Sequence, residues 1–354
     1  MPIKVPQTIL TLVAGALLLA ACGSDPGSDT GSDSAATSSG GDKTITVYSG
    51  RSESLVKPLL ERFTQQTGIA VEARYAATAA MASQLLEEGE RSPADVFFAQ
   101  DAGALGAVAK KGMLAPLSDD LVNQVPEIYR AKSKEWVGVT ARSRVLVYNP
   151  GQVTEDKLPA SVFDLTKPEW KGKVGVAPTN ASFQAFVTAI VVQHGEQKAK
   201  DFLAGLKANE PEIRDGNGPI LEEVDSGKLA VGLINHYYLG ELSKERGTTP
   251  DALTAKLHFF PGGDTGALVN VAGVGVLKKA AQDPDVQAFV TYLLSADAQQ
   301  YFAEQTFEYP LVAGVTPPAG VPALAELQAP AVDLNDLDQL EATIGLIQES
   351  GLVP

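Results

Sequence analysis

Apolar positions at the start of the globular part of the chain follow first the period of a strand and then that of a helix. Residues 44–48 alternate apolar and polar side chains, as a half-buried strand does. In residues 53–66 the apolar side chains recur every three or four positions, which predicts a helix that Gly68 ends. Residues 69–73 are then predicted as a second strand. This alternation predicts an α/β domain with a mainly parallel sheet.

The same two periods continue to the C-terminus. We predict further strands within residues 95–98, 144–150, 170–176, 228–234 and 269–277. We predict further helices at 79–88, 183–194, 196–207, 283–294 and 297–305, and one from about Leu334 to Glu349. Residues 43–354 together exceed the length that one hydrophobic core usually supports, so we expect two domains.

The N-terminus has the pattern of a secretion signal. Lys4 precedes an apolar run from Ile9 to Ala21, which is short for a membrane span and ends in Leu19-Ala20-Ala21-Cys22. This ending resembles the lipobox of bacterial lipoproteins. The resemblance implies that residues 1–22 are a lipoprotein signal peptide, with lipidation of the Cys22 thiol.

Residues 23–42 are rich in Gly, Ser, Asp and Thr, a composition that buries too little apolar surface to fold, so we predict a flexible tether. Cys22 is the chain's only cysteine. We therefore expect neither an intramolecular disulfide nor a metal site built on thiolates.

Composition excludes several classes of function. The chain has 28 Lys and Arg against 43 Asp and Glu, a formal net charge of -15, which argues against a nucleic-acid partner. Its 3 histidines are scattered along the chain, and no Ser/His/Asp or Cys/His arrangement is apparent. We expect a binding protein rather than an enzyme.

The candidate chemistry lies in Asn235-His236-Tyr237-Tyr238, directly after an apolar strand. Phenolate is a hard, anionic oxygen ligand that suits a hard cation such as Fe(III). A free tyrosine has a pKa of about 10, so only a strong Lewis acid favours the phenolate at neutral pH. The alternative is ordinary packing of two rings with one hydroxyl hydrogen-bonded.

Several short segments occur in an order that resembles the ferric-ion-binding periplasmic proteins, the substrate-binding subunits of iron ATP-binding cassette importers. The resemblance covers about residues 43–315. Its segments are 45–50, 63–69, Gly89 with 93–97, 142–145, 168–173, 234–238, 266–269 and 308–311.

The resemblance implies a two-lobed α/β fold, the type II periplasmic-binding-protein fold, with two hinge strands and the ligand in the cleft between the lobes. The first lobe would comprise residues 43–145 and 270–297. The second would comprise residues 146–269 and 298–354.

The resemblance also implies a ligand set. Tyr237 and Tyr238 would bind Fe(III), and carbonate, phosphate or citrate would complete the site. By position, the residues implied to hold the anion are Asn180, Ala181, Ser182, Asn217 and Asn235. An ordinary helix N-cap is the alternative for the 180–182 turn.

Arg51 and Arg142 are further candidates for binding the anion. Guanidinium binds carboxylate, carbonate or phosphate through paired hydrogen bonds and is always charged. The alternatives are a surface salt bridge for Arg51 and a hinge-packing contact for Arg142.

The chain departs from the family's pattern in the first lobe. Ser52 stands where some relatives have a histidine ligand, Gln100 where they have a glutamate, and Ala141 where others have a third tyrosine. Either anions and water fill the remaining iron positions, or the cargo is a chelate such as ferric citrate, or Asp101 reaches in, or the ligand is a different one. Tyr75 is a further candidate at the edge of the cleft.

These observations predict an extracytoplasmic lipoprotein of the cell envelope, anchored through Cys22, that delivers Fe(III) to an ABC permease and its ATPase. We expect a monomer. Two alternatives stay open: the same fold with an organic solute such as a phosphonate, thiamine or a polyamine, and an accessory protein of a surface sensor.

Overall fold

The computed structural model describes residues 43–353, and the predicted signal peptide, Cys22 and the tether lie outside them. Strands and helices alternate through much of this range, as the apolar pattern predicts, but the predicted mainly parallel sheet is wrong, because every pairing of β5 and β10 is antiparallel. No helix within this range is both long and apolar enough to cross a bilayer. The strands are β1 (Thr44–Ser49), β2 (Ala70–Tyr75), β3 (Val96–Ala99), β4 (Leu114–Ala115), β5 (Val137–Tyr148), β6 (Val174–Val176), β7 (Glu212–Ile213), β8 (Val231–Asn235), β9 (Lys256–His258), β10 (Val269–Leu277) and β11 (Tyr309–Pro310).

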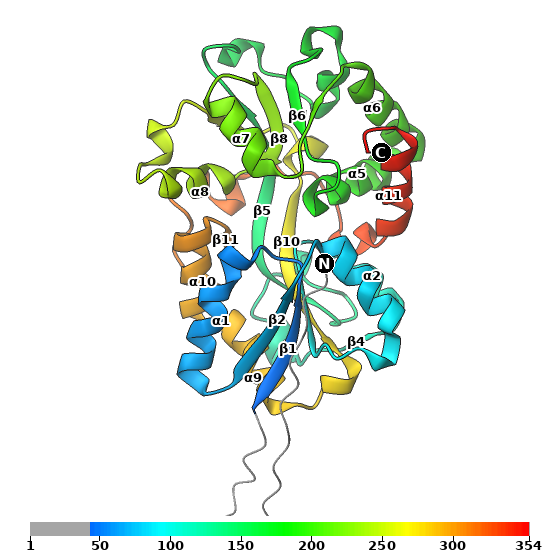
Figure 1. The fold of residues 1–354 in the computed structure, drawn as a ribbon, viewed down its shortest axis with the longest axis vertical. Coiled ribbons are helices and arrows are strands. Elements are labelled where there is room, and N and C mark those ends of the chain that lie inside the picture. Colours follow the sequence, from blue (N-terminus) through cyan, green and yellow to red (C-terminus); the bar gives the residue numbers. More distant parts are fainter. Residues whose placement is uncertain (1–42, 354) are drawn as a thin grey trace, which may run out of the picture. The chain divides into compact units, whose positions relative to one another are not determined.

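The α-helices of the described residues pack on the faces of these strands (Figure 1). They are α1 (Glu53–Thr67), α2 (Thr78–Glu88), α3 (Ala102–Lys110), α4 (Asp119–Val122), α5 (Ala181–His194), α6 (Glu196–Ala208), α7 (Asn217–Asp225), α8 (Tyr238–Glu245), α9 (Pro284–Leu293), α10 (Ala296–Tyr301) and α11 (Leu340–Glu349).

Two sheets form, and they share strand β5. The first has the order β2-β1-β3-β10-β5, in which β1 pairs in parallel with β2 and β3 while β10 is antiparallel to β3 and β5. The second continues as β5-β8-β6-β7, with β9 also paired to β5. In Figure 1 the first sheet lies below and the second above, with β5 and β10 between them.

Strand β5 changes partner in its middle. Its first half pairs with β10 up to Ser143, which lies opposite Val269. Its second half pairs with β8 from Arg144, which lies opposite Asn235. The residues at this change of partner therefore stand where the two sheets meet.

Apolar faces position the helices as the sequence predicts. Helix α1 buries Val56, Leu59, Leu60 and Phe63, and Gly68 ends it in the left-handed conformation, φ 73°, with its N–H donating to the Thr64 carbonyl. Helix α5 is buried almost all round, from Ala181 to Ile190. A separate apolar cluster joins α7 and α8 to the other face of the second sheet.

The C-terminal part contacts elements of both predicted lobes. Tyr301 of α10 donates its hydroxyl to the Leu55 carbonyl of α1 at 2.9 Å. In contrast, Thr343 of α11 hydrogen-bonds to Thr188 of α5 at 2.7 Å. The lobe boundaries at residues 145, 269 and 297 stay a prediction.

The helix predicted from Leu334 to Glu349 is two elements. Residues Leu334–Leu337 form a 3-10 turn, and α11 starts only at Leu340. The turn packs on α3, where Gly103 leaves room for the Leu337 carbonyl: a Cβ there would lie 2.4 Å from that oxygen. Packing against α3 and then α5 requires a change of direction, which a continuous helix could not make.

Gly273 lies where β10 packs closely against β5, and a substitution there tests this contact. The register shifts between Ala272 and Gly273, and a Cβ on Gly273 would lie 2.6 Å from the Val137 carbonyl oxygen. We expect Gly273→Ala to lower the free energy of unfolding by about 1–3 kcal/mol, because overpacking displaces backbone here.

Gly345→Ala is the matched control, because a Cβ at this helical glycine of α11 would meet nothing within 4 Å. It should raise stability by about 0.5–1 kcal/mol. Urea unfolding of both variants measures the difference. Equal effects of the two substitutions would contradict the close approach at Gly273.

Candidate functional site

The two adjacent tyrosines lie between the end of β8 and the start of α8. Their rings stack, with centroids 4.3 Å apart and an interplanar angle of 25°. Tyr237 is only 1% exposed. Burial raises the pKa of both phenols above the ordinary value of 10.0. Both therefore keep their protons at neutral pH unless a strong Lewis acid displaces them.

Gln100 joins the tyrosine pair from the other sheet. It directly follows β3, and its Nε2 lies 3.5 Å from the Tyr237 hydroxyl. The sequence places Gln100 at a family ligand position, and the structure brings it to the tyrosines. The end of a first-sheet strand thus meets the end of a second-sheet strand.

Asp101, the next residue, caps helix α3. Its Oδ1 accepts from the Ala104 N–H at 2.8 Å, whereas its buried Oδ2 has no hydrogen-bond partner among residues 43–353. Burial raises the pKa of this carboxyl, although backbone hydrogen bonds and Arg142 act to lower it. The carboxyl group is thus held at the start of α3, and Arg142 is its oppositely charged neighbour.

Arg142 is a buried cation that has no hydrogen-bond partner among residues 43–353. The residue is 1% exposed, and Nε, Nη1 and Nη2 all lack hydrogen-bond partners in the part of the chain that the structure describes. Burial lowers the pKa of this guanidinium, and repulsion from Arg51 adds to that effect, while Tyr237, Glu308 and Asp101 oppose it. Buried charges in proteins are normally paired.

Arg51 is also buried but has a counter-ion that the sequence reading did not assign to the site. Its Nη2 lies 2.5 Å from Oε2 of Glu308, and the two side chains are 1% and 0% exposed. Glu308 also accepts from Thr140 at 3.1 Å and Thr306 at 3.0 Å. Burial acts to lower the pKa of Arg51, but attraction by Glu308 leaves it raised. The surface salt bridge considered for Arg51 is therefore a buried ion pair.

Strands β5 and β8 and the start of helix α5 contribute a chain of hydrogen bonds. Asn235 donates to the Ser182 hydroxyl at 2.8 Å and accepts from Arg144 at 3.3 Å. Asn180 caps α5, accepting from the Ser182 N–H at 3.0 Å, and Ala181 is the first residue of that helix. These contacts bring Asn235 to the start of α5. Arg144, which the sequence reading passed over, has its pKa lowered to about 9 by burial.

Two further polar side chains belong to the site. Asn217, at the start of α7, is 1% exposed, and neither amide atom meets full hydrogen-bond geometry within the described residues, although its closeness to the Tyr238 hydroxyl acts to lower the pKa of that phenol. Glu241 follows Tyr237 by four positions and so lies on the same face of α8. Its buried Oε1 is also unpaired in that range, and burial followed by repulsion from Glu308 raises its pKa to about 8. No sequence motif singled out Glu241.

Two further residues predicted for the cleft are Ser52 and Tyr75. Ser52 is an exposed residue at the N-cap of α1. Tyr75 lines a groove of about 410 Å³ with residues of α1 and β2, and its charged neighbours are Glu53, Lys57 and Glu61. Neither side chain makes a hydrogen bond or ring contact with the tyrosine pair among residues 43–353, and their place in the cleft stays a prediction.

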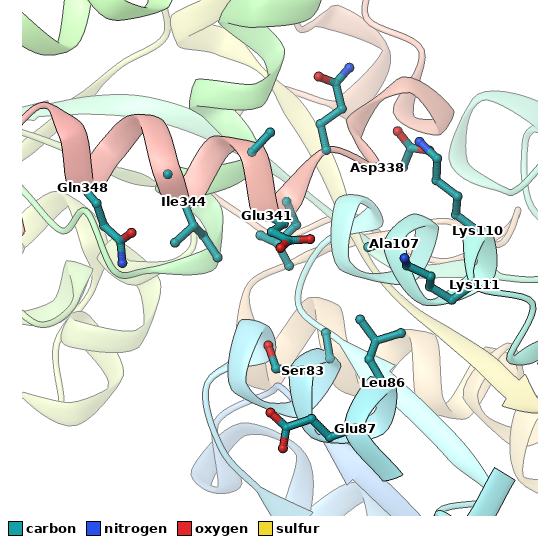
Figure 2. A pocket seen from close by; sticks show the side chains of 15 residues that line it. Ser83, Leu86, Glu87, Ala107, Lys110, Lys111, Asp338, Glu341, Ile344 and Gln348 are labelled. Atoms are coloured by element: carbon teal, nitrogen blue, oxygen red, sulfur yellow. The ribbon is translucent and has the colours of Figure 1, made fainter. Parts of the chain in front are cut away.

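A larger groove is separate from these residues. It measures about 800 Å³ and lies between α2, α3 and α11 (Figure 2). Ser83 and Leu86 of α2, Lys110 of α3 and Ile344 of α11 line it. It contains neither tyrosine and none of the buried cations. Among residues 43–353, no three His, Cys, Asp or Glu side chains gather as a metal site, so the phenols are the candidate metal ligands there.

The sequence is similar to a known protein family and to a ferric-ion-binding relative. Residues 91–340 match the family described as bacterial extracellular solute-binding protein. The chain is 34% identical over 319 residues to the Fe(3+)-binding periplasmic protein of Serratia marcescens, covering 90% of this chain and 93% of that protein.

Two solved structures are also similar. Iron-bound HitA from Pseudomonas aeruginosa matches with a TM-score of 0.82 and 35% identity, over 87% of this chain and 99% of that one. The Trichodesmium protein IdiA (FutA), in complex with iron and citrate ligands, matches with a TM-score of 0.73 and 29% identity, over 88% of this chain and 100% of that one. The predicted two-lobed, type II periplasmic-binding-protein fold is confirmed.

The two buried arginines should respond oppositely to the same substitution. Arg142→Met removes a buried charge that has no partner within residues 43–353, so we expect the ligand-free protein to gain about 1–4 kcal/mol of stability. Arg51→Met leaves Glu308 buried and unpaired, so we expect a loss of about 3–5 kcal/mol. Denaturant unfolding measures both. A loss of stability in Arg142→Met would show that this guanidinium is paired in solution.

Proposed function

The chain belongs to the ferric-ion-binding periplasmic proteins, within the bacterial extracellular solute-binding family, and we propose that it captures Fe(III) for an ABC importer. Its role is binding and delivery rather than catalysis. The observation that carries the proposal is the stacked pair of buried Tyr237 and partly buried Tyr238, together with the buried guanidinium of Arg142, which has no hydrogen-bond partner among residues 43–353.

Tyr237 and Tyr238 are the proposed protein ligands of Fe(III). Their raised pKa values mean that binding must release a proton from each phenol, which a strong Lewis acid can drive. Two phenolates neutralise only part of the ferric charge and fill only part of its coordination shell. The rest of the shell requires further oxygen ligands.

Arg142 and Arg51 favour an anion as the source of those oxygens. With two phenolates the iron keeps one net positive charge, and Arg142 adds another that no residue among 43–353 pairs by hydrogen bond. A carbonate, phosphate or citrate between iron and guanidinium would neutralise both. Asn217, with its buried amide, and the first turn of α5, with Asn180, Ala181 and Ser182, could hold the other side of the anion.

Citrate has specific support as the anion. The Trichodesmium protein is described in complex with iron and citrate. In this chain Ser52 is exposed and Asp101 caps α3, which leaves Gln100 as the first-lobe side chain in hydrogen-bond contact with the tyrosines. A chelate that brings its own oxygens suits such a site.

The proposed cycle uses the strands shared by the two sheets. The second lobe would bind the cargo through the tyrosines, and the first lobe would close over it by a hinge motion of β5 and β10. The Gln100–Tyr237 contact joins the two sheets in the conformation described here. Closure is favoured only to the extent that the ligand binds the closed state more tightly.

The cellular setting follows from the N-terminus. We propose that lipidated Cys22 anchors the protein outside the cytoplasm and that residues 23–42 let the folded part reach a permease with its ATPase. A monomer suffices for this role.

An organic anion is the second candidate for the same site. Arg51 and Arg142 would bind a phosphonate or carboxylate as well as they would bind carbonate. Absence of ferric binding in the experiment below would favour this candidate.

Removing one phenol oxygen at a time tests the ligands. We expect Fe(III)-citrate, titrated into metal-free protein, to give a visible phenolate-to-iron charge-transfer band that saturates near one iron per chain. Tyr237→Phe and Tyr238→Phe should each weaken the band and lower the affinity by more than about 100-fold, beyond the loss typical of an outer-shell partner.

Tyr75→Phe is the matched control, because Tyr75 lies in a separate groove; its band should equal that of the unaltered protein. Adding phosphate or bicarbonate in place of citrate identifies the anion. An undiminished band in both Tyr237→Phe and Tyr238→Phe would refute the assignment.

The anchor is tested separately by Cys22→Ala. We expect this variant of the full chain to leave the membrane fraction, because stable attachment requires the acyl chains. The matched control Ser28→Ala, in the tether, should stay with the membranes. Membrane retention of Cys22→Ala would exclude lipidation as the anchor.

A further inference from the structure

An irregular segment connects the two sides of the proposed iron site. The helix predicted at 297–305 is instead α10 followed by a π-helical turn, Phe302–Thr306. Phe307 follows in the left-handed conformation, φ 55°, which is uncommon for a residue with a side chain. Glu308, the partner of Arg51, comes next. Such π-turns and strained residues often mark functional positions.

The turn that bears the tyrosines holds Phe307 at two points. Nε2 of His236, directly before the pair, lies 3.0 Å from the Phe307 carbonyl oxygen. Gly240, directly after the first residues of α8, packs against the Phe307 ring, and a Cβ at Gly240 would lie 2.3 Å from Cγ of that ring. The segment therefore cannot shift without disturbing the residues on both sides of Tyr237 and Tyr238.

The contacts of His236 also fix its own orientation. Its Nδ1 accepts from the Ser143 N–H at 3.2 Å, and its backbone N–H donates to the Ser143 carbonyl at 3.1 Å. Because Nδ1 accepts a backbone N–H, the ring proton is on Nε2 and is donated to Phe307. The imidazole also stacks on Tyr309, with centroids 4.5 Å apart. His236 thus joins β5 to the 306–309 segment.

Glu308 carries this connection to the first lobe. Its carboxylate accepts from Arg51, Thr140 and Thr306, which together fix its position. Arg51 is bound through Nη2, and its buried Nε has no hydrogen-bond partner within the described residues. The guanidinium is therefore held in place through Nη2, while its Nε–H makes no hydrogen bond within the described residues.

We propose that His236 and Glu308 are positioning residues that fix the Arg51 guanidinium relative to the tyrosine pair, through the contact of the tyrosine-bearing turn with Phe307. This inference rests on the proposed ferric site, where Arg51 would face the anion. In this proposal, the position of Arg51 in the first lobe depends on His236, which directly precedes the two tyrosines proposed as ligands from the second lobe.

Two substitutions at His236 separate its connections. His236→Gln can keep a donor near the position of Nε2 for the Phe307 carbonyl, whereas His236→Asn can keep only the acceptor for Ser143. We expect His236→Asn and Glu308→Gln to lower Fe(III)-citrate affinity by about 10- to 100-fold, the usual loss for an outer-shell partner. His236→Gln should retain most of the affinity. Equal affinities of His236→Asn and His236→Gln would overturn the proposal.

His258→Gln is the matched control, because the Nε2 of His258 also contacts a backbone carbonyl, that of Pro159 at 3.0 Å, away from the tyrosines. It should leave iron affinity unchanged. Thermal unfolding of every variant identifies losses of iron affinity that come from an unstable fold alone.

A second measurement uses no iron. In ¹⁵N-labelled metal-free protein, we expect the Arg51 Nε–H signal, assigned by its loss in Arg51→Met, to shift in His236→Asn although no hydrogen bond joins the two side chains. It should not shift in His258→Gln. An unmoved Arg51 signal in His236→Asn would refute the positioning role. The Arg51 Nε–H signal does not depend on iron. If the unaltered protein gave no visible band with Fe(III)-citrate, the proposed function would be refuted. The positioning role of His236 would still be decided by the ¹⁵N spectrum.

Discussion

The site depends on one constraint: strand β5 is shared by two sheets. Arg142 lies opposite Asn270 of the first sheet, and Arg144 lies opposite Asn235 of the second. Between them, Ser143 exchanges hydrogen bonds with His236. Three consecutive residues therefore face different partners at the place where β5 changes sheets. Arg142, Arg144 and, through β8, the tyrosine pair derive their positions from this crossing.

Buried charge is distributed unevenly around that crossing. Arg51 has Glu308 as its counter-ion, whereas Arg142 has no hydrogen-bond partner in the described range and Tyr237 and Tyr238 are held neutral by burial. Such an arrangement costs stability in the ligand-free protein. Fe(III) and an anion together would convert the phenols to phenolates and pair the cation. The same groups that destabilise the empty site would thus hold the cargo, a common relation between function and stability.

Periodicity predicted most of the fold because it reports local burial. The helix at 53–66 is found as α1, and the strand at 269–277 is found as β10. Two differences came from tertiary contacts. Strand β5 starts at Val137, before the predicted residue 144, because its first half pairs with β10. The predicted helix from Leu334 to Glu349 breaks before Leu340 because its two parts pack on α3 and α5.

The sequence by itself determined the order of strands and helices, the adjacent phenols, the acidic composition and the signal pattern that ends at Cys22, because each is a property of neighbouring residues or of residue counts. The tertiary structure decided which charges are paired. Arg51 and Glu308 are 257 positions apart, whereas Arg142, also buried, has no hydrogen-bond partner within residues 43–353. Likewise Gln100 and Tyr237 are 137 positions apart, yet their side chains are in contact. Side-chain partners across that distance depend on the path of the whole chain, which no local pattern encodes.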